Sequence, residues 1–262
     1  MSRVSHPTLA EWLREAPFSL AMSAGFFGFF AHAGVLTALE DAGLLPDAKS
    51  GRVSGASAGA LVTGAWASGV DAKALADILL ALERADFWDP RFGAGLLRGK
   101  LFRERLEAIL PATTFAACRV PLAVSVFDLG TRRVRALDAG RVAPAIHASC
   151  AVPLLFHPVW IEGRAYVDGG LTDRAGLAGM REGERTLLHF LASRSPWRRA
   201  SSLQMEVPTR ANTTALVIDD LPRVGPFRLP RGAHAFDVAR RAAKRALARP
   251  VSSAATGALV RV

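Results

Sequence analysis

The sequence predicts an α/β protein with a largely parallel central sheet, and three observations support this prediction. Short apolar runs of strand length alternate with helix-length segments along most of the 262 residues. The first of these runs is continuous in apolar residues, as in parallel strands that are buried on both faces. Half of the residues are hydrophobic, which suffices for one sizeable core.

The first part of the chain divides into elements at its glycine and polar residues. The helix after the first strand stops at Gly43, a typical C-cap glycine, and Asp71 lies near the cap of the helix at 72–84. The expected elements are a short amphipathic helix at 7–16, strands at 18–23 and 52–55, helices ending near residue 42 and covering 58–68, 72–84 and 101–110, and an irregular segment at 87–99.

The second part continues the alternation of strands and helices. Gly163 separates two short runs, which predicts a hairpin that delivers Asp168 at a strand end. The expected elements are a strand pair at 121–128 and 133–137, a helix at 142–150, hairpin strands at 159–161 and 165–167, buried strands at 186–192 and 215–218, and a surface loop at 194–210. We expect one domain over 1–262, with a short helix or arm at 1–17 and a basic helix and tail at 232–262.

Residues 20–39 form an apolar stretch that is long enough to cross a bilayer. Ala31-His32-Ala33 within it resembles a signal-peptidase site, so a signal peptide or an anchor is one interpretation. Glu11 and Glu15 precede the stretch, and three glycines and His32 interrupt it. A buried strand, a glycine loop and a helix explain this pattern better.

The charge balance favours anionic partners. The formal net charge is +10, and a late segment carries Arg240, Arg241, Lys244, Arg245 and Arg249 at one-turn spacing. This segment is either an ordinary solvated helix face or a contact with an anionic membrane surface. No recognisable nucleic-acid-binding module accompanies the charge, so we expect no nucleic-acid partner.

Cysteine and histidine usage bounds the location and the cofactors. Cys118 and Cys150 do not make a disulfide framework, so a cytoplasmic protein, with peripheral membrane contact through its basic surface, is the simplest expectation. The six histidines are scattered, and none forms a cluster with zinc-ligand spacing. We therefore expect neither a metal site nor another cofactor.

Residues 55–59 read Gly-Ala-Ser-Ala-Gly, which fits a nucleophile elbow between a strand and a helix. Glycines flank Ser57 where side chains would clash, and the free amides of the following helix would face a negative oxygen. Asp168-Gly169-Gly170 follows a later strand, and active groups of parallel sheets gather at the carboxyl ends of strands. The pattern predicts acyl transfer with Ser57 as the nucleophile.

Four blocks in this order resemble the patatin-like phospholipases and together cover about residues 18–175. They are Met22-Ser23-Ala24-Gly25 through His32-Ala33-Gly34-Val35-Leu36, Gly55-Ala56-Ser57-Ala58-Gly59, Ala148-Ser149-Cys150-Ala151-Val152-Pro153 through Phe156, and Asp168-Gly169-Gly170. The resemblance implies a three-layer α/β/α fold and a Ser–Asp dyad with Ser57 as nucleophile and Asp168 as base. It also implies an oxyanion hole of backbone amides in the turn Gly25, Phe26, Phe27 and Gly28.

We therefore expect a serine hydrolase that cleaves acyl esters of lipids, similar to a phospholipase A or a lysophospholipase, through an acyl-enzyme. The family usually has a basic residue among the glycines of its oxyanion loop, but the corresponding glycine loop here, residues 24–29, contains no Arg or Lys. A catalytically weak lipid-binding or regulatory protein is therefore an alternative. A second alternative is an esterase or thioesterase in which His189 or His234 completes a triad, the chain order of α/β-hydrolases. In that fold the serine normally follows several strands, and here it follows two.

Other residues near these motifs have expected roles. Of Phe26, Phe27, Phe29 and Phe30, at least two are expected in the core, and the rest would form an acyl-chain wall or an interfacial patch. Trp88 and Phe92 either cover the site or pack in a surface loop. His32 is expected to hold the glycine loop through a backbone hydrogen bond, Asp128 to be a structural acceptor and Asp173 to cap a helix or turn.

Overall fold

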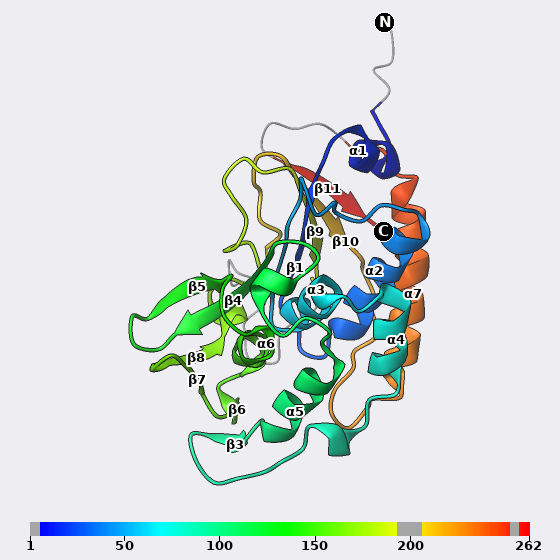
Figure 1. The fold of residues 1–262 in the computed structure, drawn as a ribbon. Helices are drawn as coiled ribbons and strands as arrows, with labels where there is room; N and C mark the ends of the chain where they lie inside the picture. Colours follow the sequence, from blue (N-terminus) through cyan, green and yellow to red (C-terminus); the bar gives the residue numbers. More distant parts are fainter. Residues whose placement is uncertain (1–5, 193–205, 252–256) are drawn as a thin grey trace, which may run out of the picture.

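The computed structural model describes residues 6–192, 206–251 and 257–262 (Figure 1). Its helices are α1 (Leu9–Glu15), α2 (Phe29–Asp41), α3 (Ala58–Ser68), α4 (Ala72–Leu80), α5 (Lys100–Ile109), α6 (Val142–Cys150) and α7 (Arg231–Leu247), with 3-10 turns η1 (Arg84–Asp86), η2 (Phe115–Ala117) and η3 (Gly169–Leu171). Its strands are β1 (Ser19–Met22), β2 (Val53–Ala56), β3 (Gly95–Leu97), β4 (Leu122–Asp128), β5 (Arg133–Leu137), β6 (Leu154–Phe156), β7 (Val159–Ile161), β8 (Arg164–Asp168), β9 (Thr186–Phe190), β10 (Thr213–Val217) and β11 (Ala258–Arg261).

A nine-stranded sheet runs through the described part of the chain in the order β11-β10-β9-β1-β2-β4-β8-β7, and β5 also pairs with β4. The strands from β11 to β4 are parallel to their neighbours. β5, β8 and β7 run antiparallel at the other end, and β3 and β6 form a separate parallel pair. The predicted α/β class with a largely parallel central sheet is confirmed.

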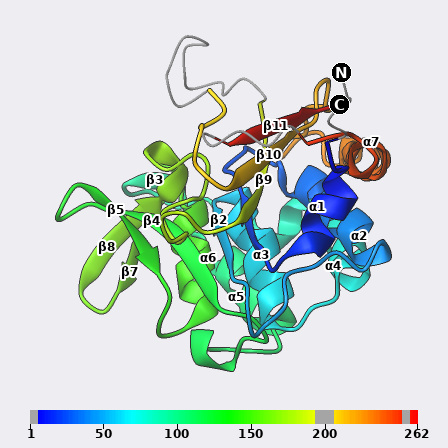
Figure 2. The ribbon, with the colours of Figure 1, turned by 90° about the horizontal axis from the view of Figure 1, so that it is seen from above.

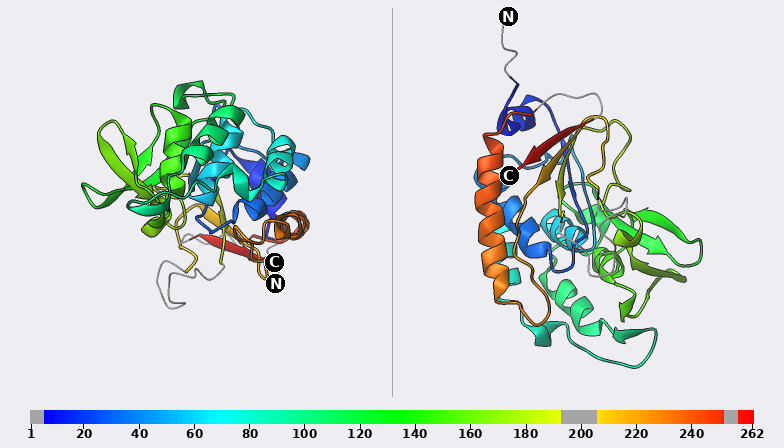
Figure 3. Two further views of the ribbon diagram at one scale, coloured as in Figure 1. Left: turned by 90° about the horizontal axis from the view of Figure 1, so that it is seen from below. Right: turned by 180° about the vertical axis from the view of Figure 1, so that it is seen from behind.

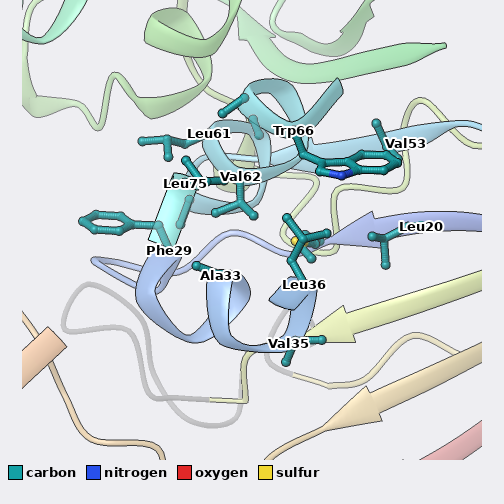
Figure 4. Packing of buried hydrophobic residues seen from close by; sticks show 14 of the residues in the cluster. Leu20, Phe29, Ala33, Val35, Leu36, Val53, Leu61, Val62, Trp66 and Leu75 are labelled. Carbon is teal, nitrogen blue, oxygen red and sulfur yellow. The ribbon is translucent and has the colours of Figure 1, made fainter. Parts of the chain in front are cut away.

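Helices cover one face of the sheet, as Figures 1 and 2 show. Leu20 of β1 and Val53 of β2 point into this helical layer and contact the core built by α2, α3 and α4, which Figure 4 shows at close range. Every residue of α3 is buried, which explains its small, apolar sequence. Gly34 allows α2 to lie against α7, because a Cβ there would collide with the Phe236 carbonyl.

The opposite face of β1, β9 and β10 has its own small core. Ala21, Leu188 and Ala215 pack there against Met180 and Leu177, which belong to the chain between η3 and β9. The predicted three-layer arrangement is confirmed, with the sheet between the helices and this covering segment. Figure 3 gives the sheet edge and the helical layer from two further directions.

The expected elements agree closely with the observed ones. The predicted helices at 58–68 and 142–150 have those bounds, and the hairpin around Gly163 is β7–β8. The helix expected at 72–84 ends at Leu80 and is followed by η1. The segment expected to be irregular at 87–99 contains β3, and the sequence patterns did not predict β6 or β11. Most of the loop expected at 194–210, and residues 252–256 of the tail, lie outside the described residues.

The apolar stretch at 20–39 is part of the core. It comprises most of the central strand β1, the glycine loop and the buried part of α2, in agreement with the strand, loop and helix interpretation. Within the described ranges, no helix is long and apolar enough to cross a membrane.

Candidate active site

Two strand ends bring Ser57 and Asp168 together. β5 occupies one edge of the outer half of β4, so β2 and β8 share the other edge. There β2 ends at Ala56 opposite Ser125, and β8 arrives from the opposite direction and ends at Asp168 opposite Val126. Ser125 and Val126 are consecutive, so the two ends meet within about one residue step, roughly 3.4 Å of strand rise. Both residues lie at strand ends as predicted, although β8 is antiparallel to β4.

Ser57 has a strained backbone conformation, which fits the nucleophile elbow expected from the sequence. Its φ is 52° and its ψ is −118°, a conformation that a non-glycine residue adopts only when its surroundings enforce it. The flanking glycines allow the close packing that imposes it. A Cβ on Gly59 would collide with the Met22 carbonyl, and a Cβ on Gly55 would collide with the backbone of Gly59. The pattern at 55–59 therefore lets α3 lie directly against β1 and β2.

Ser149 fixes the backbone at Ser57. Its hydroxyl accepts a hydrogen bond from the Ser57 amide at 2.8 Å and donates one to the Ser125 carbonyl at 2.6 Å. The neighbouring Cys150 thiol donates to the Ser57 carbonyl, with sulfur and oxygen 3.3 Å apart. Burial, together with the Asp168 carboxylate, raises the pKa of Cys150 well above its usual value, so this thiol stays protonated. α6 thus fixes the Ser57 backbone through the side chains of Ser149 and Cys150.

The backbone around Asp168 is equally constrained. Its Oδ1 accepts a hydrogen bond from the Gly170 amide at 2.7 Å, and its own amide donates to the Ala151 carbonyl at 2.9 Å. Gly169 lies directly over the Ser125 carbonyl, and a Cβ on Gly170 would collide with the Ala24 side chain. The two glycines therefore allow β4, η3 and the glycine loop to meet at the carboxylate.

The glycine loop forms a tight turn beside Ser57. The Gly28 amide donates to the Gly25 carbonyl at 2.9 Å, so Gly28 is engaged in the turn. A Cβ on either of these glycines would collide with Leu191, and Phe27 has a φ of 54°. The amides of Gly25, Phe26 and Phe27 have no hydrogen-bond acceptor among the described residues. Of the four residues expected to form the oxyanion hole, these three retain an available donor.

Two buried histidines, His32 and His189, lie against the chain just before the glycine loop. Nε2 of His32 lies 2.8 Å from the Ser23 carbonyl, and its Nδ1 lies 2.8 Å from Nδ1 of His189. A carbonyl can only accept, so Nε2 of His32 carries a proton and His189 donates from Nδ1 when both rings are neutral. Burial lowers the pKa of His32 to about 4 and that of His189 well below its usual value, so both rings are neutral. The expected role of His32 in holding the loop agrees with these contacts.

Two cavities meet at Ser57. The larger, about 430 Å³, is lined by Asp168, Arg174 and the chain from Leu221 to Val224. The smaller, about 120 Å³, is almost entirely apolar and lies between α3, α4 and α5. Both are lined by Ser57, Val152 and the chain from Gly25 to Phe27. The serine and the glycine loop therefore form the boundary between a polar compartment and an apolar one.

The aromatic and acidic side chains near the motifs differ in their burial and contacts. Phe29 and Phe30 are core residues, while Phe27 is half-buried and Phe26 is exposed. Trp88 lines the smaller cavity and Phe92 is fully exposed. Asp128 is a structural acceptor for the amides of Gly130 and Thr131, and Asp173 caps a turn by accepting from the amides of Leu177 and Ala178.

No histidine lines either cavity, and all six histidines lie in the described part of the chain. His189 is paired with His32, and His234 is exposed on α7. The triad alternative therefore has no histidine within the two compartments. Groups of histidine, cysteine or acidic residues that could hold a metal ion are absent from residues 6–192, 206–251 and 257–262.

Comparison with known families agrees with this geometry. The sequence model of the family described as patatin-like phospholipase matches residues 20–179, which is more than half of the chain. The chain belongs to the patatin-like phospholipase family. The matched region contains the glycine loop, Ser57, Ser149 and Asp168.

Individual relatives are more distant. Uncharacterized NTE family proteins of Mycobacterium bovis and Mycobacterium tuberculosis are each 29% identical over 163 residues, which is 61% of this chain and 44% of theirs. The chain thus spans less than half the length of these relatives. The crystal structure of VipD from Legionella pneumophila matches with a TM-score of 0.64 and 15% identity, over 88% of this chain and 66% of that chain. At this identity the likeness concerns the fold.

Ser149 contacts the backbone of Ser57, and sequence reasoning did not identify it. The block Ala148-Ser149-Cys150-Ala151-Val152-Pro153 marked its position, but nothing in the pattern shows that the hydroxyl reaches across to β2 and β4. Arg174 was also missed. It is buried, donates to the Leu191 carbonyl at 2.9 Å and accepts from the Ala24 amide through its own carbonyl at 2.7 Å. It therefore links the glycine loop to the end of β9.

Proposed function

We propose that the protein is a serine hydrolase that cleaves acyl esters of lipids through a Ser57–Asp168 dyad. The observation that carries this proposal is the meeting of the β2 and β8 ends on one edge of β4, beside a turn with available amides. Patatin-like phospholipases act on lipid substrates, and an apolar cavity at Ser57 suits an acyl chain. A phospholipase A or a lysophospholipase reaction is the corresponding activity.

The reaction begins at the Ser57 hydroxyl, which is a weak nucleophile until a base removes its proton. Asp168 accepts that proton as the serine oxygen forms a bond to the ester carbonyl carbon. The carbonyl oxygen becomes negative and takes hydrogen bonds from the amides of Gly25 and Phe26 in the turn and of Ala58 at the start of α3. Each such donor contributes about 3 kcal/mol to stabilising the transition state in comparable sites.

Collapse of the tetrahedral intermediate breaks the bond to the leaving alcohol, which takes the proton from Asp168. The acyl group remains on Ser57. Water then attacks the acyl-enzyme, gives its proton to Asp168, and the fatty acid leaves as the proton returns to Ser57. Ser57 and Asp168 are therefore restored to their starting protonation states after each turnover.

The two cavities suggest how the substrate is oriented. The apolar compartment between α3, α4 and α5 would hold the acyl chain, because its lining is mostly apolar, with Ser57, Asp86 and Arg105 as the main polar residues. The larger compartment, with Asp168 and Arg174, would hold the alcohol part of the ester and the attacking water. In this arrangement the scissile bond lies over Ser57, between the two.

Hydrolysis of p-nitrophenyl butyrate by purified variants tests the proposal. Ser57→Ala and Asp168→Asn should each lower kcat/KM by roughly 10⁴-fold or more, as in other nucleophile and base deletions. His234→Ala is the matched control and should hydrolyse at the wild-type rate, because His234 lies outside both cavities. Full activity in either dyad variant would end the proposal, and loss in the control would favour a histidine triad.

A further inference from the structure

We infer that the surface around the mouth of the two cavities is a docking face for an anionic lipid bilayer. This inference rests on the proposed function, because the bilayer would supply the ester. Five exposed apolar side chains define the lipid-docking face, namely Phe26, Phe92, Leu96, Leu154 and Phe227. Large apolar side chains gathered on one exposed surface indicate an interaction site.

The exposure of these side chains is unusually high. Phe92 is fully exposed, Leu154 is 78% exposed and Phe227 is 70% exposed. Leu154 even keeps a positive φ of 68°, a conformation that leucine rarely adopts. Burying them in the interfacial region of a bilayer would recover the cost of this exposure.

The face is continuous with the candidate active site. Phe26 and Leu154 line the larger cavity, and Phe26 also lines the smaller one. Leu96 lies in β3, which pairs with β6 through Gly95 and Leu154. The chain bearing Phe227 contributes Pro226 to the smaller cavity. A bilayer on this face would therefore meet the openings that lead to Ser57.

A stacked cluster fixes one side of this face. The guanidinium of Arg84 lies 5.2 Å from the Phe227 ring centre and 5.9 Å from the Trp88 ring centre, and the two rings are 5.6 Å apart. These contacts hold the segment before α7 against η1. They also place a cation beside two aromatic rings. Such side chains are stable at the boundary between the headgroups and the acyl chains of a bilayer, because they have both a polar and an apolar part.

The charge around the face complements anionic headgroups. The segments 83–100 and 221–231 together carry seven cationic and three anionic side chains, so their net charge is +4 (7 − 3). The cations are Arg84, Arg91, Arg98, Lys100, Arg223, Arg228 and Arg231, and the anions are Glu83, Asp86 and Asp89. The Asp89 carboxylate accepts from the amides of Gly99 and Lys100, so it is already engaged. Arg91, Arg98, Arg223 and Arg228 have no ion-pair partner among the residues that the structure describes.

The basic end of α7 is a weaker candidate for membrane contact. Arg240 and Lys244 both pair with Asp41, at 2.7 and 2.9 Å. The chain just after α7 is bonded to α1, through the Leu9 amide and the Arg249 carbonyl. Figure 1 and the right panel of Figure 3 show this end of α7 far from β3 and β6, at the other end of the molecule. A bilayer there would not meet the cavity mouth.

Vesicle sedimentation of the full chain tests the inference without requiring turnover. Wild-type protein should sediment with vesicles of phosphatidylcholine and phosphatidylglycerol, and less with phosphatidylcholine alone or at high salt. The double variant Phe92→Ser/Leu96→Ser should lose about ten-fold or more in vesicle partitioning, since each side chain adds apolar area to the contact. Neither residue lines a cavity, so hydrolysis of p-nitrophenyl butyrate should stay unchanged.

Two controls make the result specific to this face. Leu259→Ser removes a side chain with the same exposure as Leu96, 49% against 50%, from β11 at the far end, and should bind vesicles normally. Arg241→Glu/Arg245→Glu reverses charge on α7 and should reduce binding less than Arg91→Glu/Arg98→Glu.

Wild-type binding by the Phe92/Leu96 variant, equal loss in Leu259→Ser, or loss confined to the α7 variant would each overturn the inference. A change in the oligomeric state of the Phe92/Leu96 variant with unchanged vesicle binding would instead assign the face to contacts between copies.

Discussion

Ser149 shows how a single hydroxyl sets the geometry of the proposed nucleophile. The Ser149 hydroxyl is fully buried, accepts a hydrogen bond from the Ser57 amide and donates one to the Ser125 carbonyl. Ser149→Ala should lower the free energy of unfolding by about 1–3 kcal/mol, because a buried amide and a carbonyl both lose their partner. It should also lower kcat for p-nitrophenyl butyrate more than it raises KM, because Ser57 loses its fixed position.

Ser68→Ala is the matched control for this prediction. Ser68 is also buried, but its hydroxyl donates to the Ala65 carbonyl within α3, remote from the cavities. Urea unfolding and steady-state kinetics should show reduced stability with unchanged kcat in this control. If Ser149→Ala and Ser68→Ala behave alike in kcat, Ser149 has no positioning role.

The His32–His189 pair gives the protein a specific acid sensitivity. Both folded-state pKa values lie below the usual 6.5, that of His32 at about 4. As the pH falls below 6.5, the unfolded chain therefore binds more protons than the folded protein. Their contribution to stability is therefore complete above about pH 6.5 and is lost as the pH falls towards the folded pKa. The cost reaches about 1.4 kcal/mol per pH unit for each histidine.

His32→Gln tests this account, because glutamine can keep the donor to the Ser23 carbonyl without titrating. Between about pH 7 and pH 5 the variant should lose less unfolding free energy than the wild type, by roughly 1 kcal/mol or more. His147, whose pKa burial lowers to about 3, contributes equally to both proteins. His32→Leu removes the donor and should lower kcat at neutral pH. Identical pH profiles for wild type and His32→Gln would contradict the assignment.

At the scale of elements, α4 and α5 form the wall of the compartment proposed for the acyl chain. Ile109 of α5 lines this cavity and is half-buried, so a larger side chain there can fill space without disturbing the core. Ile109→Trp should lower kcat/KM for a long-chain p-nitrophenyl ester by about ten-fold while leaving the acetate ester nearly unaffected. Leu247→Trp on α7, outside both cavities, is the control. An equal effect on both esters would place the acyl chain elsewhere.

Most elements could be predicted from the sequence because their signals are local. Gly43 and Gly69 end α2 and α3, and the small residues of α3 follow from its complete burial. β6 could not be predicted, because it pairs with β3 across more than fifty residues and its residues are too few to show a period. The antiparallel course of β8 was missed for the same reason, since pairing direction depends on distant partners.

The candidate site shows the same division between local and long-range information. Ser57 and Asp168 could be identified because glycines mark the tight backbone around each of them. The engagement of the Gly28 amide and the role of Ser149 depend on which groups the fold brings within hydrogen-bond reach. Such contacts leave no periodicity in the chain, so sequence patterns did not reveal them.

At the scale of the whole molecule, we propose that the chain forms one domain. The larger of the two cores joins Leu9 and Leu13 of α1 to Ala239 of α7 and Val260 of β11. Thermal unfolding followed by far-UV and near-UV circular dichroism should therefore give one coincident transition. Removal of residues 232–262 should prevent folding, because α7 covers α2 and β11 extends the sheet. Two separate transitions, or a stable truncated chain, would contradict a single domain.

The most direct test of the Ser57–Asp168 dyad is labelling with a fluorophosphonate, with the modified peptide identified by mass spectrometry. The dyad predicts one adduct, on Ser57, that forms rapidly in the wild type and much more slowly in Asp168→Asn. Ser57→Ala should remain unlabelled. Absence of labelling in the wild type would leave a lipid-binding protein without catalysis. An adduct on another residue, or labelling that is equally fast in Asp168→Asn, would contradict the dyad.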